Sequence, residues 1–385
     1  MNSVFPYTAR DLYDWLTAGE DVVVVDVRNE KEFARFKVEG PRPFPLLNIP
    51  YFDFMEMERE SVARLPRGKR LRFICATEAS AKYVAEIAGK HGFNDAGYLT
   101  GGISSWGNLL VPRRVAAAAG YELYQFIRPG KASCSYGLVA GEEMMLFDPS
   151  RNVEFYLDFA DRKNARIVKS FETHLQADYI AGSRMIAERA GAEFLANEAD
   201  FQGAKIAYTP LRDGRRYGFS AGGPAIRALF TPGHTPGSTS YCIDDTFMLS
   251  GDTVFIRSIG RPDLGGRAEE WSKLLFATMQ AVRRMDPNLV VLPGHFIAWD
   301  EADSELVFRC PLGEAIRRNE SIYAMDTVDR FIDFIKANIR PQPEEYARIR
   351  RINANLEQAD EEEQEILDIG KNECAASAYA RLQTA

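Results

Sequence analysis

The chain has 385 residues, of which 46% are hydrophobic and 26% are charged, the balance of an ordinary globular protein. This length exceeds what a single core usually fills, so we expect two domains. The formal net charge of -8 argues against a protein that binds nucleic acid or anionic membranes. The sequence contains no run of about 18 apolar residues, so we predict no transmembrane helix.

The first residues and the cysteines indicate a reducing compartment. Residues 1–6 show no basic stretch followed by an apolar one, so we expect no secretory signal. The five cysteines are widely spaced and odd in number, which favours free thiols over a disulfide framework. We therefore predict a cytoplasmic protein.

Predicted strands and helices alternate through the first hundred residues. Thr8 precedes a helical apolar pattern and is a candidate N-cap, and the β-branched run DVVVVDVR predicts a strand buried on both faces. The predicted helices cover 8–18, 30–36 and 80–90, and the second buried strand covers 71–75. This alternation is typical of an open parallel α/β sheet.

The sequence changes character over residues 108–122, which contain Pro112, two arginines and the alanine run 116–119. We place a domain boundary there, which predicts one domain over 1–112 and a second over 120–385. The alanines are equally compatible with a short linking helix.

The second domain is predicted to mix strands with helices, as a large α/β sandwich does. Helices are expected over 183–191 and 268–284, and residues 311–385 are predicted to form a mostly helical, polar C-terminal extension. The predicted strands are YQFIRP, CSYGLVA, EMMLFDP, ARIVKSFET, AKIAYTP, ALFTPG, YCIDDTFMLSGD and NLVVLPGH.

Cys75 is the first candidate for chemistry. It ends the second predicted strand and precedes a tight loop, residues 76–80, which leads into a helix. Backbone N–H groups of such a loop and the positive end of the helix favour a thiolate, the nucleophilic form, which could carry sulfane sulfur as a persulfide. A buried structural cysteine is the alternative.

Three segments around Cys75 resemble the rhodanese family over about residues 5–110. Residues 26–33 resemble its DVR-x-x-x-E-F motif, residues 47–50 its N-I-P segment, and residues 101–106 its closing G-G-x-x-x-W. The resemblance implies a parallel α/β domain in which Cys75 transfers sulfur.

The loop after Cys75 departs from the usual rhodanese pattern Cys-x-x-Gly-x-Arg-Ser. Glu78 stands at the glycine position and Ser80 at the arginine position. Glu78 places a carboxylate beside an anion site, and the loss of the arginine removes a cation for thiosulfate or sulfite. A weakly active or purely structural domain is therefore the alternative.

Three of the four histidines lie in predicted loops at strand ends, and one aspartate lies in a loop of the same kind. These residues are His174, His234, His295 and Asp252. A glycine precedes His234, His295 and Asp252, and glycine lets the backbone approach a ligand or a metal closely. Although each residue alone is more often structural, the combination indicates a metal site.

The segments T-H-x-x-A-D, T-P-G-H-T-P-G-S, S-G-D and P-G-H resemble, in order, motifs of the metallo-β-lactamase superfamily in its hydrolase and dioxygenase branch. The resemblance implies an αββα sandwich with the site along one sheet edge. The first family motif is H-x-H-x-D-H, but Gln176 and Tyr179 replace its second and third histidines here. A dinuclear zinc centre is therefore not expected, and Gln176, Asp178, Tyr179 and His295 would be what remains of a second site.

His174, His234 and Asp252 survive from the family's ligand set. Two imidazoles and one carboxylate form the facial triad of non-haem Fe(II) oxygenases, and persulfide dioxygenases of this superfamily bind a single iron through these positions. The resemblance thus implies one Fe(II) per chain, with Zn as the alternative, and leaves Asp178 and His295 to orient ligands or bound water.

Residues 260–266 resemble the G-R-T-D segment of persulfide dioxygenases, with Pro262 in place of the threonine. Arg261 could hold a substrate carboxylate, with Asp263 beside it, or it could form a structural ion pair with Asp263. We predict Cys75, Asp178 and Arg261 as catalytic residues.

The segment 370–375 resembles the G-x-N-x-C-A ending of related rhodanese–lactamase fusions. Its cysteine, Cys374, could approach a site or could be an ordinary buried or surface thiol.

The resemblance as a whole implies a persulfide dioxygenase that uses O₂ to convert a low-molecular-weight thiol persulfide to sulfite and free thiol, with a sulfurtransferase domain attached. The thiol carrier stays open among glutathione, bacillithiol and coenzyme A, and a homodimer is compatible because enzymes of this branch are often dimers. One alternative is a zinc-dependent thioester hydrolase of the glyoxalase II type. The other is a degenerate, non-catalytic protein that binds sulfur species or a protein partner.

Overall fold

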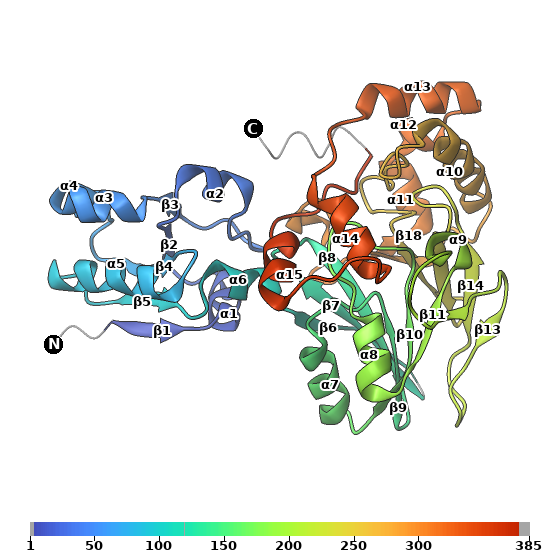
Figure 1. The fold of residues 1–385 in the computed structure, drawn as a ribbon, viewed down its shortest axis with the longest axis horizontal. Helices are drawn as coiled ribbons and strands as arrows, with labels where there is room; N and C mark the ends of the chain where they lie inside the picture. Colours follow the sequence, from blue (N-terminus) through green and yellow to red (C-terminus); the bar gives the residue numbers. More distant parts are fainter. Residues whose placement is uncertain (1–3, 119, 377–385) are drawn as a thin grey trace. The chain divides into compact units, whose positions relative to one another are not determined.

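The computed structural model describes residues 4–118 and 120–376, which divide into two units (Figure 1). The first unit runs to Val111 and also includes Arg128–Lys131 and Ile369–Lys371. The second unit comprises Pro112–Ile127, Ala132–Asp368 and the described residues from Asn372 onward. The polypeptide therefore returns to the first unit twice after leaving it.

A five-stranded parallel sheet forms the centre of the first unit, with the strand order β1-β5-β4-β2-β3. Its strands are β1 (Phe5–Tyr7), β2 (Val22–Asp26), β3 (Leu46–Asn48), β4 (Arg70–Ile74) and β5 (Ala96–Leu99). Its helices are α1 (Ala9–Ala18), α2 (Glu30–Arg35), α3 (Tyr51–Glu56), α4 (Glu58–Ala63), α5 (Glu78–Lys90) and α6 (Gly102–Asn108). Strand β2 is buried along its whole length, as its valines predict. The predicted parallel α/β sheet is confirmed.

Helix α1 begins with the cap that the sequence predicts. The Thr8 hydroxyl accepts a hydrogen bond from the Asp11 N–H at 3.1 Å, and the Asp11 carboxylate accepts one from the Thr8 N–H at 2.8 Å. This reciprocal pair satisfies two N–H groups that the first turn of a helix leaves without partners.

The alanine-rich boundary segment is a strand, and the linking helix offered as one option for it is wrong. Strand β6 covers Val111–Ala118, and its two buried valines, Val111 and Val115, lie on the inside. It forms the edge of a sheet beside β7 (Tyr121–Arg128). Pairing with a neighbouring strand overrides the helix preference of alanine here.

Two sheets form the second unit. The first has the order β12-β11-β10-β9-β8-β7-β6 and the second the order β13-β14-β15-β16-β17-β18. The further strands of the first sheet are β8 (Ser133–Ala140), β9 (Glu143–Phe147), β10 (Arg166–Phe171), β11 (Glu193–Ala196) and β12 (Thr209–Pro210). Those of the second are β13 (Arg216–Tyr217), β14 (Ile226–Phe230), β15 (Thr239–Ile243), β16 (Phe247–Gly251), β17 (Val290–Pro293) and β18 (Cys310–Pro311).

Aromatic rings fill the space between the two sheets. The Tyr241 ring from the second sheet lies 5.2 Å from the rings of both Phe147 and Phe171 in the first, and the two phenylalanines stack at 4.9 Å. Helices α7 (Val153–Arg162) and α8 (Ser183–Ala190) pack on the first sheet, and α11 (Leu312–Arg318) packs on the second. This is the αββα sandwich that the resemblance implied.

Two of the predicted strands in this unit have different extents. The segment YCIDDTFMLSGD forms two antiparallel strands, β15 and β16, because Asp244 and Asp245 make a tight turn with φ angles of 52° and 47°. Of the predicted strand AKIAYTP, only Thr209–Pro210 is paired.

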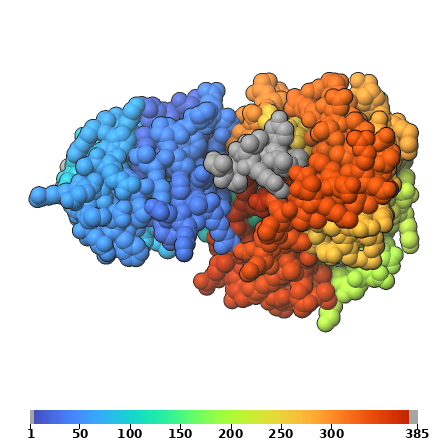
Figure 2. All heavy atoms as spheres, turned by 90° about the horizontal axis from the view of Figure 1, so that it is seen from above, coloured from blue at the N-terminus to red at the C-terminus, as the bar shows by residue number. Residues whose placement is uncertain are grey.

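The C-terminal extension is helical, as predicted, over its described part. It contains α11 and also α12 (Glu320–Tyr323), α13 (Val328–Asn338), α14 (Glu345–Asn353) and α15 (Glu361–Asp368). These orange and red segments cover much of the second unit's face in Figure 2. The predicted helix over 268–284 is α10 (Ala268–Val282). Across residues 4–118 and 120–376, no helix combines the length and the apolar character needed to cross a bilayer.

Candidate metal centre

The predicted ligands all follow the ends of strands in the sandwich. His174 comes three residues after β10, His234 lies between β14 and β15, and Asp252 directly follows β16. Both sheets therefore contribute loops to one edge of the second unit.

Three buried ligand atoms meet at this edge. Nε2 of His234 lies 3.4 Å and Nε2 of His174 lies 3.8 Å from the same oxygen, Oδ2 of Asp252. Within residues 4–118 and 120–376, none of these three atoms has a hydrogen-bond partner, although all three side chains are buried. Two atoms that bind one ion through bonds of about 2.1 Å at a tetrahedral angle lie about 3.4 Å apart. The observed distances thus fit a shared metal ion, which also explains why the three atoms lack other partners.

Hydrogen bonds fix which nitrogen of each imidazole faces the centre. Nδ1 of His234 contacts the carbonyl oxygen of Arg261 at 2.9 Å, and a carbonyl can only accept. Nδ1 of His174 contacts the hydroxyl of Thr173 at 2.9 Å, and that hydroxyl donates its proton to Asp148 at 2.9 Å. Both Nδ1 atoms therefore carry the proton, and both Nε2 atoms present a lone pair to the centre.

The charges of the site match this assignment. Burial lowers the pKa of His174 to about 3, which keeps its imidazole neutral at physiological pH. Burial alone would raise the pKa of Asp252, but His295, His234 and His174 outweigh it and hold that pKa below its ordinary value. A carboxylate and two neutral imidazoles are the protonation states in which these groups bind metals.

Glycines allow the close packing around Asp252. A Cβ atom on Gly260 would overlap the carbonyl oxygen of Asp252, and one on Gly294 would lie 2.7 Å from Oδ1 of the same residue. The role proposed for glycine from the sequence, close approach of the backbone to the ligands, thus has a structural basis at Gly294.

Comparison with known proteins supports both halves of this architecture. Residues 8–109 match the Rhodanese-like domain family, and residues 129–295 match the Metallo-beta-lactamase superfamily. A hydroxyacylglutathione hydrolase of Anaeromyxobacter dehalogenans is 31% identical over 186 residues, which are 48% of this chain and 68% of that protein. This chain belongs to the metallo-beta-lactamase superfamily. Its first unit is a rhodanese-like domain.

A second relative, the hydroxyacylglutathione hydrolase of Acidiphilium cryptum, is 35% identical over 123 residues, and the match covers 32% of this chain and 48% of that protein.

Two solved structures share the fold. A metallo-beta-lactamase from Staphylococcus aureus has a TM-score of 0.54 at 24% identity over 61% of this chain and 72% of its own. ETHE1 from Myxococcus xanthus has a TM-score of 0.52 at 23% identity over 61% and 98%.

The two residues that replace the superfamily's histidines bond to Asp148. The Gln176 amide donates to the Asp148 carboxylate at 3.1 Å, and the Tyr179 hydroxyl donates to the Asp148 carbonyl at 3.3 Å. Burial raises the pKa of Asp148 to about 6. Because both side chains bond to Asp148 and neither carries an imidazole, neither replacement offers a nitrogen ligand to the centre.

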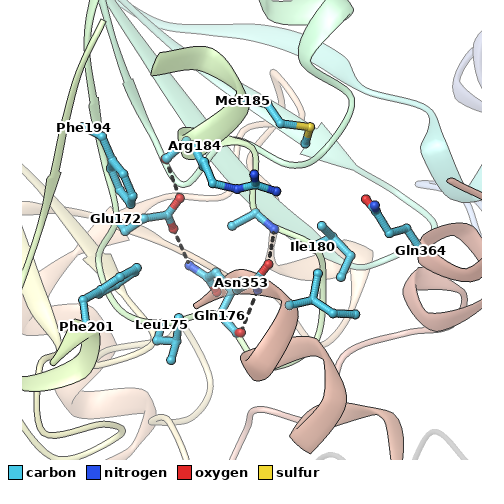
Figure 3. Close-up of a pocket in the computed structure, with 13 residues that line it drawn as sticks. Glu172, Leu175, Gln176, Ile180, Arg184, Met185, Phe194, Phe201, Asn353 and Gln364 are labelled. Carbon is cyan, nitrogen blue, oxygen red and sulfur yellow. Dashed lines mark hydrogen bonds between the residues drawn. The ribbon is translucent and has the colours of Figure 1, made fainter. Parts of the chain in front are cut away.

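Gln176 also lines a small cavity that the sequence did not indicate. The cavity has a volume of about 20 Å³ and lies between Gln176, Glu172 and Asn353 (Figure 3). This space is enough for about one water molecule. The Asn353 amide donates to the carbonyls of Gln176 and Tyr179, both at 2.9 Å, so α14 anchors the loop that carries Asp178.

Arg261 lies in an ion pair with Asp263, the structural alternative that the sequence left open. Its Nε and Nη2 atoms donate to the two Asp263 oxygens at 2.7 and 2.6 Å, and Nη2 also donates to the Arg340 carbonyl at 2.5 Å. Both side chains are buried. A substrate carboxylate would have to displace Asp263 to use the same donors.

His295 and Asp178 lie beside the three ligands. Nδ1 of His295 contacts Oδ1 of Asp252 at 2.7 Å, and its Nε2 contacts Oδ2 of Asp178 at 3.0 Å. Burial would lower the pKa of His295, but the two carboxylates raise it to about 10. Cys374 also lies in this group, so it approaches a site, which is one of the two options that the sequence leaves for this residue.

Cys75 follows β4 in the rhodanese-like domain, and its loop is shorter than predicted. Helix α5 begins at Glu78, so only Ala76 and Thr77 separate it from the cysteine, and Thr77 caps the helix. Cys75 is buried, and burial raises the pKa of its thiol against the opposing effect of the Thr77 and Ala76 N–H groups and the Ser80 hydroxyl. The loop geometry expected to favour a thiolate is thus present, but desolvation of the sulfur has the larger effect and favours the neutral thiol.

The rhodanese motifs brace this domain. Asp26 and Arg28 form a buried ion pair at 2.6 Å, and the Asn48 amide donates to the carbonyls of both, each at 2.9 Å. The Glu78 carboxylate accepts from the Gly101 N–H at 3.0 Å, so it binds a backbone donor next to the cysteine loop.

Proposed function

We propose that the second unit is a mononuclear non-haem iron persulfide dioxygenase that acts on a low-molecular-weight thiol persulfide. One persulfide, one O₂ and one water would give sulfite, free thiol and two protons. The observation that carries the proposal is the meeting of three buried atoms that have no partner in the described part of the chain: Nε2 of His174, Nε2 of His234 and Oδ2 of Asp252. Two imidazoles and one carboxylate are the facial triad of such oxygenases.

The chain's own residues prepare this site for an ion. The Nε2 atoms of His174 and His234 present lone pairs because the protonated Nδ1 atoms donate hydrogen bonds, to the Thr173 hydroxyl and to the Arg261 carbonyl respectively. Three protein ligands leave positions for both reactants, and a ferrous ion held there would supply the redox chemistry that O₂ requires. Gln176 and Tyr179, bonded to Asp148, favour this reading over a dinuclear hydrolase.

The rhodanese-like domain would exchange sulfane sulfur with the same thiol pool. In this step the Cys75 thiolate attacks the outer sulfur of a persulfide, the S–S bond breaks, and the carrier leaves as a thiolate that takes up a proton. Asp178 and Arg261 keep the catalytic and substrate-binding roles predicted from the sequence as proposals.

The decisive experiment is oxygen uptake by full-length protein purified without oxygen and loaded with Fe(II). Glutathione, bacillithiol and coenzyme A persulfides would be compared as substrates, with sulfite measured as product. His234→Ala should lower oxygen uptake by more than about 100-fold, since even partners of metal ligands are worth 10–100-fold. His91→Ala is the matched control, because His91 lies in the rhodanese-like domain, where its ring contacts Glu58. Oxygen uptake that does not depend on iron or on His234 would overturn the proposal.

A zinc-dependent thioester hydrolase is the second candidate. The two relatives named hydroxyacylglutathione hydrolase, at 35% and 31% identity, favour it. Zinc-loaded protein would then hydrolyse a glutathione thioester, and the iron-loaded protein would consume no oxygen with any persulfide.

A further inference from the structure

The proposed metal centre is closed in this structure. The side chains of His174, His234 and Asp252 are only 3%, 0% and 2% exposed. A thiol persulfide has to reach the space between these three side chains, so part of the chain must move aside to admit it. The segments that surround the centre differ in what such a movement would cost.

Residues 372–376, which we call the tail segment, lie along the loop that follows β16. The Arg261 N–H donates to the Cys374 carbonyl at 2.8 Å, and the Ala376 N–H donates to the Ile259 carbonyl at 2.8 Å. These bonds fix the position of the tail segment against the loop that supplies the carboxylate ligand.

The inner side of the tail segment faces the centre, and its outer side faces solvent. The Cys374 side chain is 1% exposed, and its sulfur lies within 4.8 Å of a carboxylate oxygen of Asp178 and of a ring nitrogen of His295. His295 in turn contacts the ligand Asp252 at 2.7 Å. The preceding side chain, Glu373, is 40% exposed. The tail segment thus covers the centre on this side.

The tail segment is easier to displace than the loop with which it pairs. A single isolated bridge, between Gly260 and Ala375, links the two. The buried side chains of the tail segment are small, one cysteine and two alanines. The loop instead buries four large apolar side chains, which are Val254, Phe255, Ile256 and Ile259. Because the cost of exposure grows with apolar area, we expect local opening to begin at the tail segment.

We infer that the tail segment is a gate, which must lift from the loop after β16 before a thiol persulfide can reach the metal centre. The inference rests on the proposed metal centre, but not on the reaction that the centre catalyses. The same movement exposes the Cys374 thiol, so the opening of the gate can be measured without catalysis.

Two side chains of the C-terminal extension latch the gate. Arg340 donates to the carbonyl of Ala375 at 2.8 Å and to that of Glu373 at 3.3 Å, and it forms an ion pair with the Glu373 carboxylate at 2.9 Å. The Tyr346 hydroxyl accepts a hydrogen bond from the Glu373 N–H at 2.7 Å. Replacing either residue therefore loosens the tail segment and leaves all three proposed metal ligands in place.

The first measurement follows alkylation of Cys374 by iodoacetamide in metal-free, full-length protein. Arg340→Met should raise this rate by about tenfold or more, since hydrogen bonds from a charged donor change an opening equilibrium by about that factor. Arg348→Met is the matched control, because its two ion pairs, at 2.6 and 2.9 Å, are made to glutamates elsewhere in the extension. The equally buried Cys242 in β15 should react at the same rate in every variant, because it reports unfolding of the sheet.

The second measurement follows release of Co²⁺ from the loaded protein to EDTA, by the loss of the visible absorption of the bound ion. If the tail segment is the gate, release should level off at high EDTA concentration, where opening limits the rate. Arg340→Met should then raise the release rate by about the same factor as the alkylation of Cys374, and Arg348→Met should release Co²⁺ as wild type does.

Tyr346→Phe gives a milder test in case Arg340→Met does not fold. It removes one acceptor and should raise both rates several-fold, because the Glu373 N–H loses its partner. Faster alkylation of Cys374 with unchanged release of Co²⁺ would overturn the gate, as would two rates that neither variant changes. Failure of the wild type to bind Co²⁺ would remove the metal centre and the gate with it, whereas release that ignores the tail segment would remove the gate alone.

Discussion

Cys75 shows how desolvation competes with backbone dipoles around one sulfur atom. The N–H groups of Ala76 and Thr77 and the Ser80 hydroxyl stabilise the thiolate, as a short strand-to-helix loop should. Burial favours the neutral thiol more strongly, so the pKa rises above its ordinary value. A persulfide-forming cysteine in this loop would therefore depend on an incoming group to replace the missing arginine.

The raised pKa predicts slow alkylation of Cys75 at neutral pH. Because only the thiolate reacts, its rate with iodoacetamide should rise through a midpoint above that of a free cysteine, about 8.5. Mass spectrometry of the Cys75 peptide across a pH series measures this rate separately from the other thiols. Ser80→Ala, which removes one group that stabilises the thiolate, should move the midpoint higher still. A midpoint at or below that of a free thiol would contradict the prediction.

At the scale of elements, the start of α6 depends on close contact with the cysteine loop. Gly102 has a φ of +64°, and a Cβ atom there would overlap the carbonyl oxygen of Ala76. The next N–H, from Ile103, donates to the Cys75 carbonyl at 2.8 Å. In the G-G-x-x-x-W motif, Gly102 thus lets helix and loop meet, and the tryptophan, Trp106, is fully buried.

Gly102→Ala should therefore lower the free energy of unfolding of the rhodanese-like domain by about 2–4 kcal/mol, from left-handed strain plus overpacking. Gly68→Ala is the control, because Gly68 has a similar φ of +72° but a Cβ atom there would meet no described atom within 4 Å, and it should cost about 1 kcal/mol. Urea denaturation of both variants gives the comparison. Equal losses would show that the contact with Ala76 contributes nothing.

The sequence predicts elements well where the pattern is local and poorly where distant pairing decides. The valines of β2 and the cap at Thr8 are both local signals, and both are present in the structure. The sequence does not predict strand β6, because its alanines favour a helix and only the pairing with β7 determines its form. The three triad ligands follow from family motifs, but the approach of Cys374 depends on pairing between Ala375 and Gly260, which lies far earlier in the chain.

At the scale of the whole molecule, a boundary drawn at one point in the sequence does not separate the two units. The first unit includes Arg128–Lys131, which follow the boundary segment. The buried Arg128 side chain donates to the Gly107 carbonyl at 2.7 Å and to the Asn108 side chain at 3.1 Å. Such short returning segments carry no periodic signal, so sequence patterns cannot assign them.

Arg128→Met should consequently destabilise the rhodanese-like domain by about 1–3 kcal/mol, because it leaves a buried carbonyl without a donor. Hydrogen exchange should rise in α6 and its surroundings and stay unchanged in β9 and β10. The exposed Arg166, which pairs with Glu143 at 2.9 Å, gives the control variant Arg166→Met with little effect expected. Increased exchange confined to β9 and β10 in Arg128→Met would contradict this assignment.

The glycines around Asp252 have a consequence for how an ion enters. Gly260 and Gly294 let the surrounding backbone pack directly against Asp252, and two rings are already turned toward it by bonds that involve no ion. The binding geometry is thus preorganised, so occupancy demands little rearrangement of the polypeptide. The choice among cations at this site then depends on their electronic preferences and on their supply in the cell. A rigid, preorganised site of this kind should bind a wrong ion almost as fast as the right one.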